Sequence, residues 1–218
     1  MKTSFFYRNS LSIVFLTLFV CAMIAQTYFG WQERLAEYQE EAGAYISLAS
    51  YLKSGHFIAA TLENFQSEFL QMALYVVLTI SLRQIGSAES KSLDKPEEVD
   101  RTPVPHPDAP ICVKKGGWRL HLYQNSLSIA FAVLFILSWL GHLYGSYKSF
   151  SEENLLKGKP PVGLGKFLTE PQFWFETFQN WQSEFLSVAS IVILTIFLRQ
   201  KGSPESKPVD SPHMETGK

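Results

Sequence analysis

The sequence predicts an all-α, polytopic membrane protein with four transmembrane helices, and the distribution of charge is the first observation behind this. Residues 11–29 and 122–147 contain no formal charge, and each run is long enough for a helix that crosses a hydrocarbon core of about 30 Å. Two further uncharged runs, 69–82 and 185–198, reach that length only if their helices extend back through a glutamate. The expected spans lie near residues 9–29, 62–83, 124–144 and 178–199.

The second observation is an internal repeat. A shift of 116 positions aligns residues 7–94 with 123–210 without a gap, and 35 of the 88 aligned pairs are identical. This predicts two tandem two-helix repeats, 1–85 and 118–202. Because each repeat holds an even number of spans, both enter the membrane in the same orientation and form a parallel repeat.

The third observation is the distribution of basic residues around the spans. Thirteen Lys and Arg residues lie on the side of the two termini and the central linker, against six on the other side. The positive-inside rule therefore places both termini and the central linker in the cytoplasm. The linker 86–117 is rich in proline and charge, which predicts extended or disordered chain, and the tail 203–218 has the same character.

A cleavable signal peptide is the alternative for the first apolar run, because two basic residues precede it. That run is longer than a usual signal core. A near copy also recurs at 123–143, where no signal peptide can lie. We therefore expect the first run to be a retained span, with no cleaved signal peptide.

Composition argues against several other classes of function. The net charge of −1 and the scattered basic residues predict no nucleic-acid partner. Cys21 and Cys112 belong to no CxxC or Cys/His spacing, so neither a zinc site nor a redox motif is predicted. The segment "GLGK" at 163–166 lacks the spacing of a phosphate-binding loop. We expect no cofactor, no metal and no catalytic constellation.

Signals at the helix ends extend the second and fourth spans. Pro171 suits the first turn of a helix, and Ser54 suits the cap before the matching helix of the first repeat. The return helices are thus expected over about 55–83 and 171–199. Their outer turns carry aromatic residues that fit an interfacial belt, and their last turns carry arginine. The expected interfacial anchors are Phe65, Trp174, Trp181, Arg83 and Arg199.

Two glutamates, Glu68 and Glu184, occupy the same position in the two repeats. Fifteen residues separate Glu68 from Arg83, or about 22 Å of helix, which places the carboxylate inside the outer leaflet near its edge. An ionisable group there is costly unless it faces protein, water or a partner. The candidate polar pair with its neighbours comprises Glu68, Glu184, Asn64, Asn180, Gln66, Gln182, Ser67 and Ser183.

Two interpretations of this polar pair remain open. In the first it is a structural anchor, and in the second it handles a proton or a cation, with two nearby carboxylates that share a proton. His56 and His142 lie near the same boundary, where an interfacial role is expected rather than a ligand role. Identity between the repeats does not separate these interpretations, because duplication and packing also preserve residues.

Specific motifs connect the chain with a known family. With "NWQSEFL" at 180–186, "LTIFLRQKGSPESKPV" at 194–209 and "PH..TG" at 212–217, it resembles a family of small bacterial integral membrane proteins known only as a domain of unknown function. The resemblance covers nearly the whole chain. It implies the membrane architecture, in the inner membrane of a bacterial cell, and carries no activity, substrate or cofactor. The first repeat departs from the motif, since Phe65 stands where the second repeat has Trp181 and lacks the indole N–H donor.

Together these observations predict a non-enzymatic structural or interaction protein of the envelope. Its expected partners are the lipid bilayer and either a second copy of the chain or another envelope protein. The alternative is a small proton- or cation-handling transporter or channel that uses Glu68 and Glu184. An intramembrane enzyme has only these glutamates and His142 in its favour, and we expect no enzymatic activity.

Overall fold

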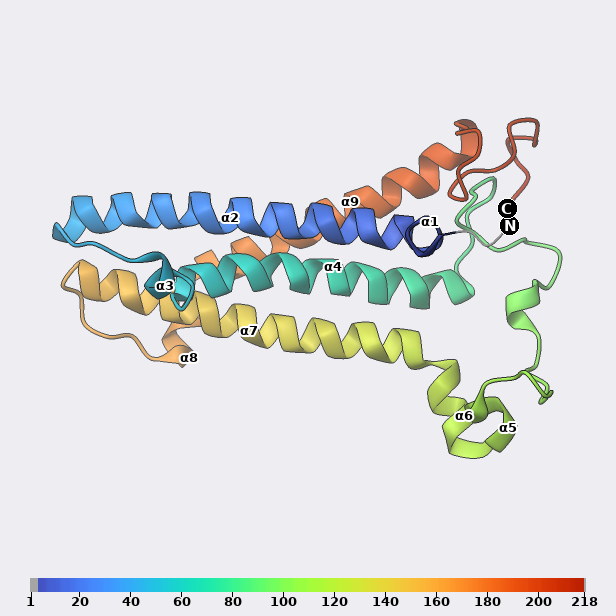
Figure 1. Ribbon diagram of the computed structural model, residues 1–218, viewed down its shortest axis with the longest axis horizontal. Helices are drawn as coiled ribbons and strands as arrows, with labels where there is room; N and C mark the ends of the chain where they lie inside the picture. Colours follow the sequence, from blue (N-terminus) through green and yellow to red (C-terminus); the bar gives the residue numbers. More distant parts are fainter. Residues whose placement is uncertain (1–3, 218) are drawn as a thin grey trace. The chain divides into compact units, whose positions relative to one another are not determined.

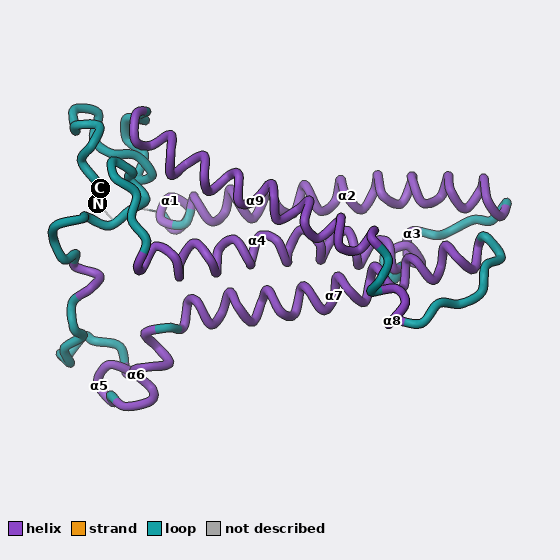
Figure 2. Tube along the Cα trace, turned by 180° about the vertical axis from the view of Figure 1, so that it is seen from behind, coloured by secondary structure: helices purple, strands orange, loops and turns teal. Residues whose placement is uncertain are grey.

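All of the regular secondary structure in the part of the chain that the structure describes is helical. A computed structural model describes residues 4–217, with helix over 68% of those residues and no strand among them (Figure 2). Three of its helices are long and apolar enough to cross a membrane: α2 (Ser10–Ala42), α7 (Ser126–Leu156) and α9 (Pro171–Phe197). The all-α prediction is confirmed, together with these three candidate spans.

The remaining expected span corresponds to α4 (Gly55–Ser81), which is not among the candidate spans. The reason lies in its composition, because the middle of α4 is rich in polar side chains. These are Glu63, Asn64, Gln66, Glu68 and Gln71. On apolar length alone, the structure therefore supports three spans, and the fourth depends on what these polar groups contact.

Both return helices begin where the sequence places them. The side chain of Ser54 accepts a hydrogen bond of 3.2 Å from the backbone N–H of Phe57, which confirms Ser54 as the cap of α4. Pro171 is the first residue of α9, where its fixed φ and missing N–H do no harm. The two helices have the same length, 27 residues each.

The first and third long helices extend well beyond their apolar runs. Helix α2 continues to Ala42, where Gly43 takes a left-handed conformation (φ 58°) and donates to the carbonyl of Gln39 at 3.1 Å. Helix α7 continues to Leu156. An uncharged run marks only the membrane-compatible part of a helix, whereas glutamate-rich sequence continues the helix into water.

The chain divides into two compact units, and α4 and α7 each contribute to both. Unit 1 comprises Met1–Leu62 and Gly141–Glu170, and unit 2 comprises Glu63–Leu140 and Pro171–Lys218. Lys218, at the end of the tail, lies outside the described residues. The two units are described separately below.

In unit 1, a short helix packs against the C-terminal half of α2 (Figure 1). This is α3 (Leu48–Tyr51), in the segment whose apolar pattern predicts a short amphipathic helix. Tyr51 is buried, and its ring meets Phe57 edge-on at 5.5 Å. Trp31 donates from its indole nitrogen to the carbonyl of Ile46 at 2.9 Å. Two further short helices in this unit are α1 (Phe5–Arg8) and α8 (Leu164–Phe167).

The beginning of α4 meets α7 at backbone contact. A Cβ added to Gly145 would lie 2.4 Å from the amide nitrogen of Ala59, and one added to Gly55 would lie 2.1 Å from that of Ser149. Neither position has room for a side chain. This is the small-residue helix contact that membrane proteins use to bring backbones together.

Charged groups join the polar ends of α2 and α7 in the same unit. Arg34, which is buried, pairs with Glu37 at 2.5 Å and with Glu153 at 3.5 Å. Glu152 accepts a hydrogen bond of 3.2 Å from the backbone N–H of Gly55, at the positive end of α4. The two helices are therefore connected by ion pairs beyond their apolar parts.

In unit 2, the long helices are the remainder of α4, the beginning of α7, and α9. Aromatic edges join α7 to α9: Trp139 meets Phe173 with ring centroids 6.3 Å apart, and Phe135 meets Trp181 at the same separation. The linker carries two short elements, η1 (Glu98–Asp100) and α5 (Ile111–Lys115), before α6 (Gly117–Gln124).

The turns that follow α4 and α9 repeat the same hydrogen bonds. The hydroxyl of Ser90 accepts from the amide of Gln84 at 3.0 Å, and that of Ser206 accepts from the amide of Gln200 at 2.9 Å. The glycine of each "GS.ESK" motif has a positive φ, 79° at the first and 84° at the second. The shared motif thus encodes a helix-ending turn twice.

The tail, for which the composition predicts disorder, is bound to the first of these turns. Lys207 is 2% exposed, and its ammonium donates to the carbonyls of Gly86, Pro212, His213 and Glu215 at 2.6, 3.3, 2.8 and 2.7 Å. Burial and then the positive charge of Arg199 lower the pKa of Lys207 from its ordinary value. The four carbonyls counter this by stabilising the charged form.

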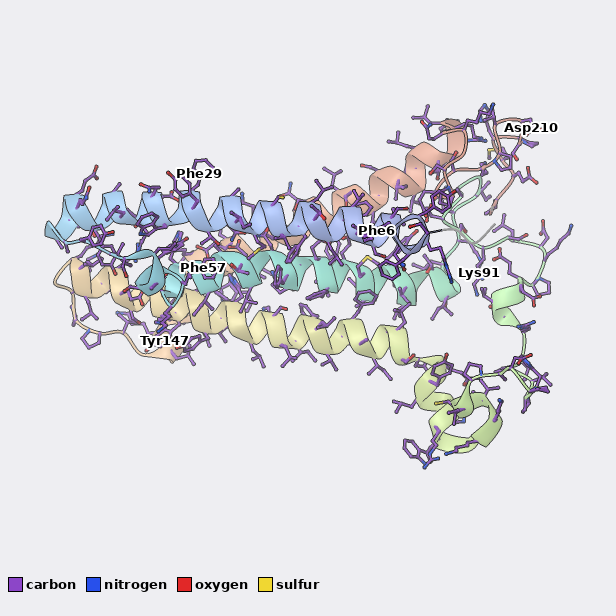
Figure 3. The ribbon with its side chains drawn as sticks, viewed as in Figure 1. Phe6, Phe29, Phe57, Lys91, Tyr147 and Asp210 are labelled. Atoms are coloured by element: carbon purple, nitrogen blue, oxygen red, sulfur yellow. The ribbon has the colours of Figure 1, made fainter. Side chains whose placement is uncertain are left out.

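The long helices of both units carry large apolar side chains on their surfaces. Phe29 of α2 points away from the other helices of unit 1 and is 69% exposed (Figure 3). In unit 2, Leu137, Leu186 and Phe197 are also exposed. Surfaces of this kind are costly in water and suited to lipid.

Candidate functional site

Polar side chains of α4 and α9 meet along one line in unit 2. We call this line the polar seam and define it by its six residues: Glu63, Gln66 and Gln71 of α4, and Asn180, Trp181 and Ser187 of α9. Each contact joins one helix to the other. The seam is built from the part of α4 that is too polar to qualify as a span by composition.

At one end of the seam, the amide of Asn180 donates to the carboxylate of Glu63 and also to the carbonyl of Glu176 in its own helix, at 3.0 Å. Glu63 and Glu176 lie close enough for their charges to interact. Asn180 therefore supplies a neutral donor to the carboxylate of Glu63, beside the second acidic residue Glu176. A buried carboxylate needs such a donor in place of water.

In the middle of the seam, the indole N–H of Trp181 donates to Oε1 of Gln66 at 2.7 Å. Gln66 is 0% exposed, and within residues 4–217 its Nε2 has no hydrogen-bond partner. One buried amide group thus depends on one indole. The repeat explains the asymmetry, because Phe65 occupies the matching position in α4 and has no N–H to offer.

At the other end, the amide of Gln71 donates to the hydroxyl of Ser187 at 3.0 Å. These two residues occupy matching positions in the repeats, 116 residues apart. Contact between matching positions occurs where two helices pass each other in register. The hydrogen bonds of the seam therefore fix the position of α4 along α9.

The predicted glutamate pair lies beside the seam. Glu68 is exposed and Glu184 is half-buried, and the two are close enough for their charges to interact. Their matching neighbours differ in environment. Gln66 and Ser67 are buried whereas Gln182 and Ser183 are exposed, and Asn64 is exposed whereas Asn180 is half-buried. The structure thus brings Gln66 and Asn180 into the seam and leaves the other predicted residues at its margin.

The two serines of this group bond within their own helices. The hydroxyl of Ser67 donates to the carbonyl of Asn64 at 2.9 Å, and that of Ser183 to the carbonyl of Asn180 at 2.8 Å. A serine that bonds the preceding turn leaves its hydroxyl oriented along the helix. Neither serine therefore joins α4 to α9.

The predicted anchors at the helix ends behave alike in the two repeats. Nη1 of Arg83 donates to the carbonyls of Ile80 and Leu82, at 3.1 and 2.9 Å. Nη1 of Arg199 donates to those of Ile196 and Leu198, at 3.2 and 2.8 Å. Each arginine thus satisfies the free carbonyls of its helix end.

The aromatic anchors of α9 cluster with one another. Trp174 is exposed and stacks on Phe178, with ring centroids 6.2 Å apart, and Phe178 meets Trp181 edge-on at 5.4 Å. Phe65 is half-buried and contacts Phe69 at 6.2 Å. This belt lies at the end of α9 where the seam begins.

Residues 4–217 contain no group of three or more His, Cys, Asp or Glu residues placed to hold a metal ion. His142 is buried, and its Nδ1 lies 3.4 Å from the hydroxyl of Ser146. His56 contacts the hydroxyl of Tyr51 at 3.3 Å. Each histidine thus has a local partner in unit 1.

Comparison with known proteins identifies the family. The family model described as "Domain of unknown function (DUF6766)" matches residues 2–218. The chain belongs to the DUF6766 family. This confirms the resemblance to an uncharacterised family, since the match covers both repeats, the linker and the tail. No curated protein and no solved structure matches this DUF6766 chain.

The motifs of this DUF6766 chain consist of residues that the two repeats share. Glu63 and Glu176 are not among these shared residues. Glu63 aligns with Gln179, and Glu176 with Ala60. A comparison of repeats therefore passes over the carboxylate that is hydrogen-bonded across the seam. The signal available in the sequence was Glu63, the other acidic residue of "LENFQSE", which lies five positions before Glu68.

We expect the variant Trp181→Phe to lose about 1–3 kcal/mol of unfolding free energy, because it leaves the buried amide of Gln66 without a partner. Adding Gln66→Leu to this variant removes the unpaired group and should recover most of the loss. Thermal unfolding in detergent micelles measures both steps. Trp174→Phe serves as the control, because Trp174 is exposed and is not one of the six residues of the seam. Additive losses from Trp181→Phe and Gln66→Leu would contradict the pairing.

Proposed function

We propose that this DUF6766 chain is a multi-pass, non-enzymatic structural or interaction protein of the bacterial inner membrane. In this proposal α2, α4, α7 and α9 all cross the bilayer. They form two tandem parallel hairpins with both termini in the cytoplasm. The chain acts by association with a second copy of itself or with another envelope protein.

The observation that carries the proposal is the mutual hydrogen bonding of the polar seam. Polar groups inside a bilayer are tolerated when they bond to a neighbouring helix, and they then hold the helices together. Glu63 with Asn180, Gln66 with Trp181, and Gln71 with Ser187 fit this use. The seam favours α4 as the fourth span, because its polar face has partners on α9.

The equal lengths and matching ends of α4 and α9 support the parallel repeat. Both have 27 residues, and both end in the same arginine-capped turn. The excess of basic residues beside those ends supports a cytoplasmic position for them. Association in the membrane is supported by the exposed apolar surface of the helices.

A second candidate function is the handling of a proton or a cation. The observation in its favour is the concentration of carboxylates beside the seam, where Glu63 interacts with Glu176 and Glu184 with Glu68. Acidic groups in such surroundings can accept a proton or attract a cation. The carboxylates would then be a transport site, and the amide groups of the seam would support it.

Ion flux through reconstituted proteoliposomes separates the two functions. We expect the wild-type chain to conduct protons and monovalent cations no faster than protein-free liposomes, because the seam is hydrogen-bonded. The measurement uses a pH-sensitive dye and an imposed potential. Cross-linking in native membranes should in parallel give dimers or larger species.

The controls of the flux experiment are the double variant Glu68→Gln with Glu184→Gln, and Glu40→Gln, which alters an exposed carboxylate of unit 1. A leak in the wild type that is lost in the double variant but kept in Glu40→Gln would overturn the structural role. Such a result would establish the transport role. An unchanged melting temperature of the double variant would show that the loss is not unfolding.

A further inference from the structure

A groove of about 510 Å³ lies between the C-terminal halves of α4 and α9 in unit 2. Its walls are mostly apolar: Leu74 and Leu78 of α4, with Leu82 just after it, line the groove together with Val188, Ala189 and Val192 of α9. Charged groups gather at one end, where the segment that follows α4 contributes Arg83 and Glu89. The groove therefore combines an apolar channel with a charged mouth.

The two repeats differ at this groove. The chain covers the helix face of α9 around Thr195, whereas the matching face of α4 around Thr79 lines the open groove. Thr195 of α9 is covered by the turn after α4, since its hydroxyl lies 3.2 Å from that of Ser87 and accepts from the amide of Ala88 at 3.3 Å. Thr79, its counterpart in α4, lines the groove and bonds to the carbonyl of Tyr75 in its own helix, at 2.7 Å. One helix face is thus covered by protein, and its counterpart is left for another occupant.

The charged mouth carries both signs of charge. Nη1 of Arg83 is held by the carbonyls of its own helix end. Nη2 of Arg199 donates to the carbonyl of Ser211 at 3.2 Å, whereas Nη2 of Arg83 makes no such bond to the tail within residues 4–217, and the charge of Arg83 interacts with that of Asp100. The guanidinium therefore has donors left for a phosphate, which it binds well. Glu89, which accepts from the hydroxyl of Tyr75, supplies negative charge at the same mouth.

We propose that this groove binds one phospholipid whose headgroup carries a phosphate and a primary ammonium, as in phosphatidylethanolamine. An acyl chain occupies the apolar channel, the phosphate binds Arg83, and the ammonium lies toward Glu89. The charges of the mouth match those of this headgroup, and an acyl chain matches the apolar walls. The inference rests on the proposed membrane position of α4 beside α9.

Native mass spectrometry of the full chain, delipidated in detergent and titrated with single lipids, tests the proposal. We expect one phosphatidylethanolamine to bind at least tenfold more tightly than phosphatidylcholine, which has no N–H, or phosphatidylglycerol, which has no ammonium. Glu89→Gln should reduce the preference over phosphatidylcholine. Equal binding of the three lipids, or tighter binding of phosphatidylglycerol, would overturn the headgroup assignment.

Two matched variants test the location. Leu78→Trp fills the groove and should weaken the binding of the lipid at least tenfold. Leu194→Trp changes the matching residue of the second repeat, which lies outside the groove, and should leave lipid binding unchanged. An equal effect of the two variants at equal melting temperature would place the lipid elsewhere and overturn the site. Failure of the proposed membrane position of α4 is a distinct result, since Leu78→Cys, with Cys21 and Cys112 replaced by serine, would then react with a water-soluble thiol reagent in intact membranes.

Discussion

The variant Gly145→Leu is expected to lose about 3 kcal/mol of unfolding free energy, or about 10 °C in melting temperature. Helices α4 and α7 touch at backbone distance in unit 1. Even a Cβ on Gly145 would lie 2.4 Å from the nitrogen and 2.9 Å from the Cα of Ala59. A backbone cannot move aside as the tip of a flexible side chain can. The helices must therefore separate, and they lose the packing around the contact. Thermal unfolding in detergent micelles measures the loss.

The control for this variant is Gly163→Leu. Gly163 has a φ of −74°, which any residue adopts, and a Cβ there would meet nothing within 4 Å. Its melting temperature should stay within about 1 °C of the wild type, in keeping with an exposed site that has no special contact. If both leucine variants melt with the wild type, the close approach of α4 and α7 is refuted.

The variant Lys207→Met is expected to release the tail from the turn after α4. The ammonium of Lys207 bonds four carbonyls, and methionine can bond none of them, so buried acceptors lose their donor. We expect the amides of Gly86 and Gly217 to exchange hydrogen about a hundredfold faster, or about 2.8 kcal/mol. These amides donate to Thr216 and Ser87, so they report directly on tail binding.

The repeat provides the control for the tail as well. Lys91 is the counterpart of Lys207, and its ammonium pairs with Asp100 instead of a set of carbonyls. Lys91→Met should therefore leave the exchange of the Gly86 and Gly217 amides unchanged. Equal acceleration in both variants would mean that the carbonyl contacts of Lys207 do not hold the tail.

The first residues of α4 and α9 were predictable because they depend on local chemistry. Ser54 accepts a backbone N–H and Pro171 opens a helix without needing one, and both effects act within a single turn. The ends of α2 and α7 were not predictable from apolar runs. Charged residues appear beyond 29 and 144. They end the stretch of sequence that suits a membrane, but they do not end the helix.

The candidate site was predictable in part. Repeat comparison selected Gln66 and Asn180, which do join α4 to α9, and it singled out the indole of Trp181 as the difference between the halves. It gave first place to Glu68 and Glu184, which lie beside the seam, and passed over Glu63. The residues that meet along two helices depend on their relative rotation, and identity between repeats does not encode that rotation.

The sequence by itself predicted the all-helical class, four spans of which three are candidate spans in the structure, the duplication and the family. Each of these follows from local composition or from similarity along the chain. Only the tertiary structure decided that Gly55 and Gly145 are backbone contacts, that Lys207 holds the tail, and that one of two matching helix faces is an open groove. These features depend on distances between residues far apart in sequence, and two repeats with the same motifs can still be surrounded differently.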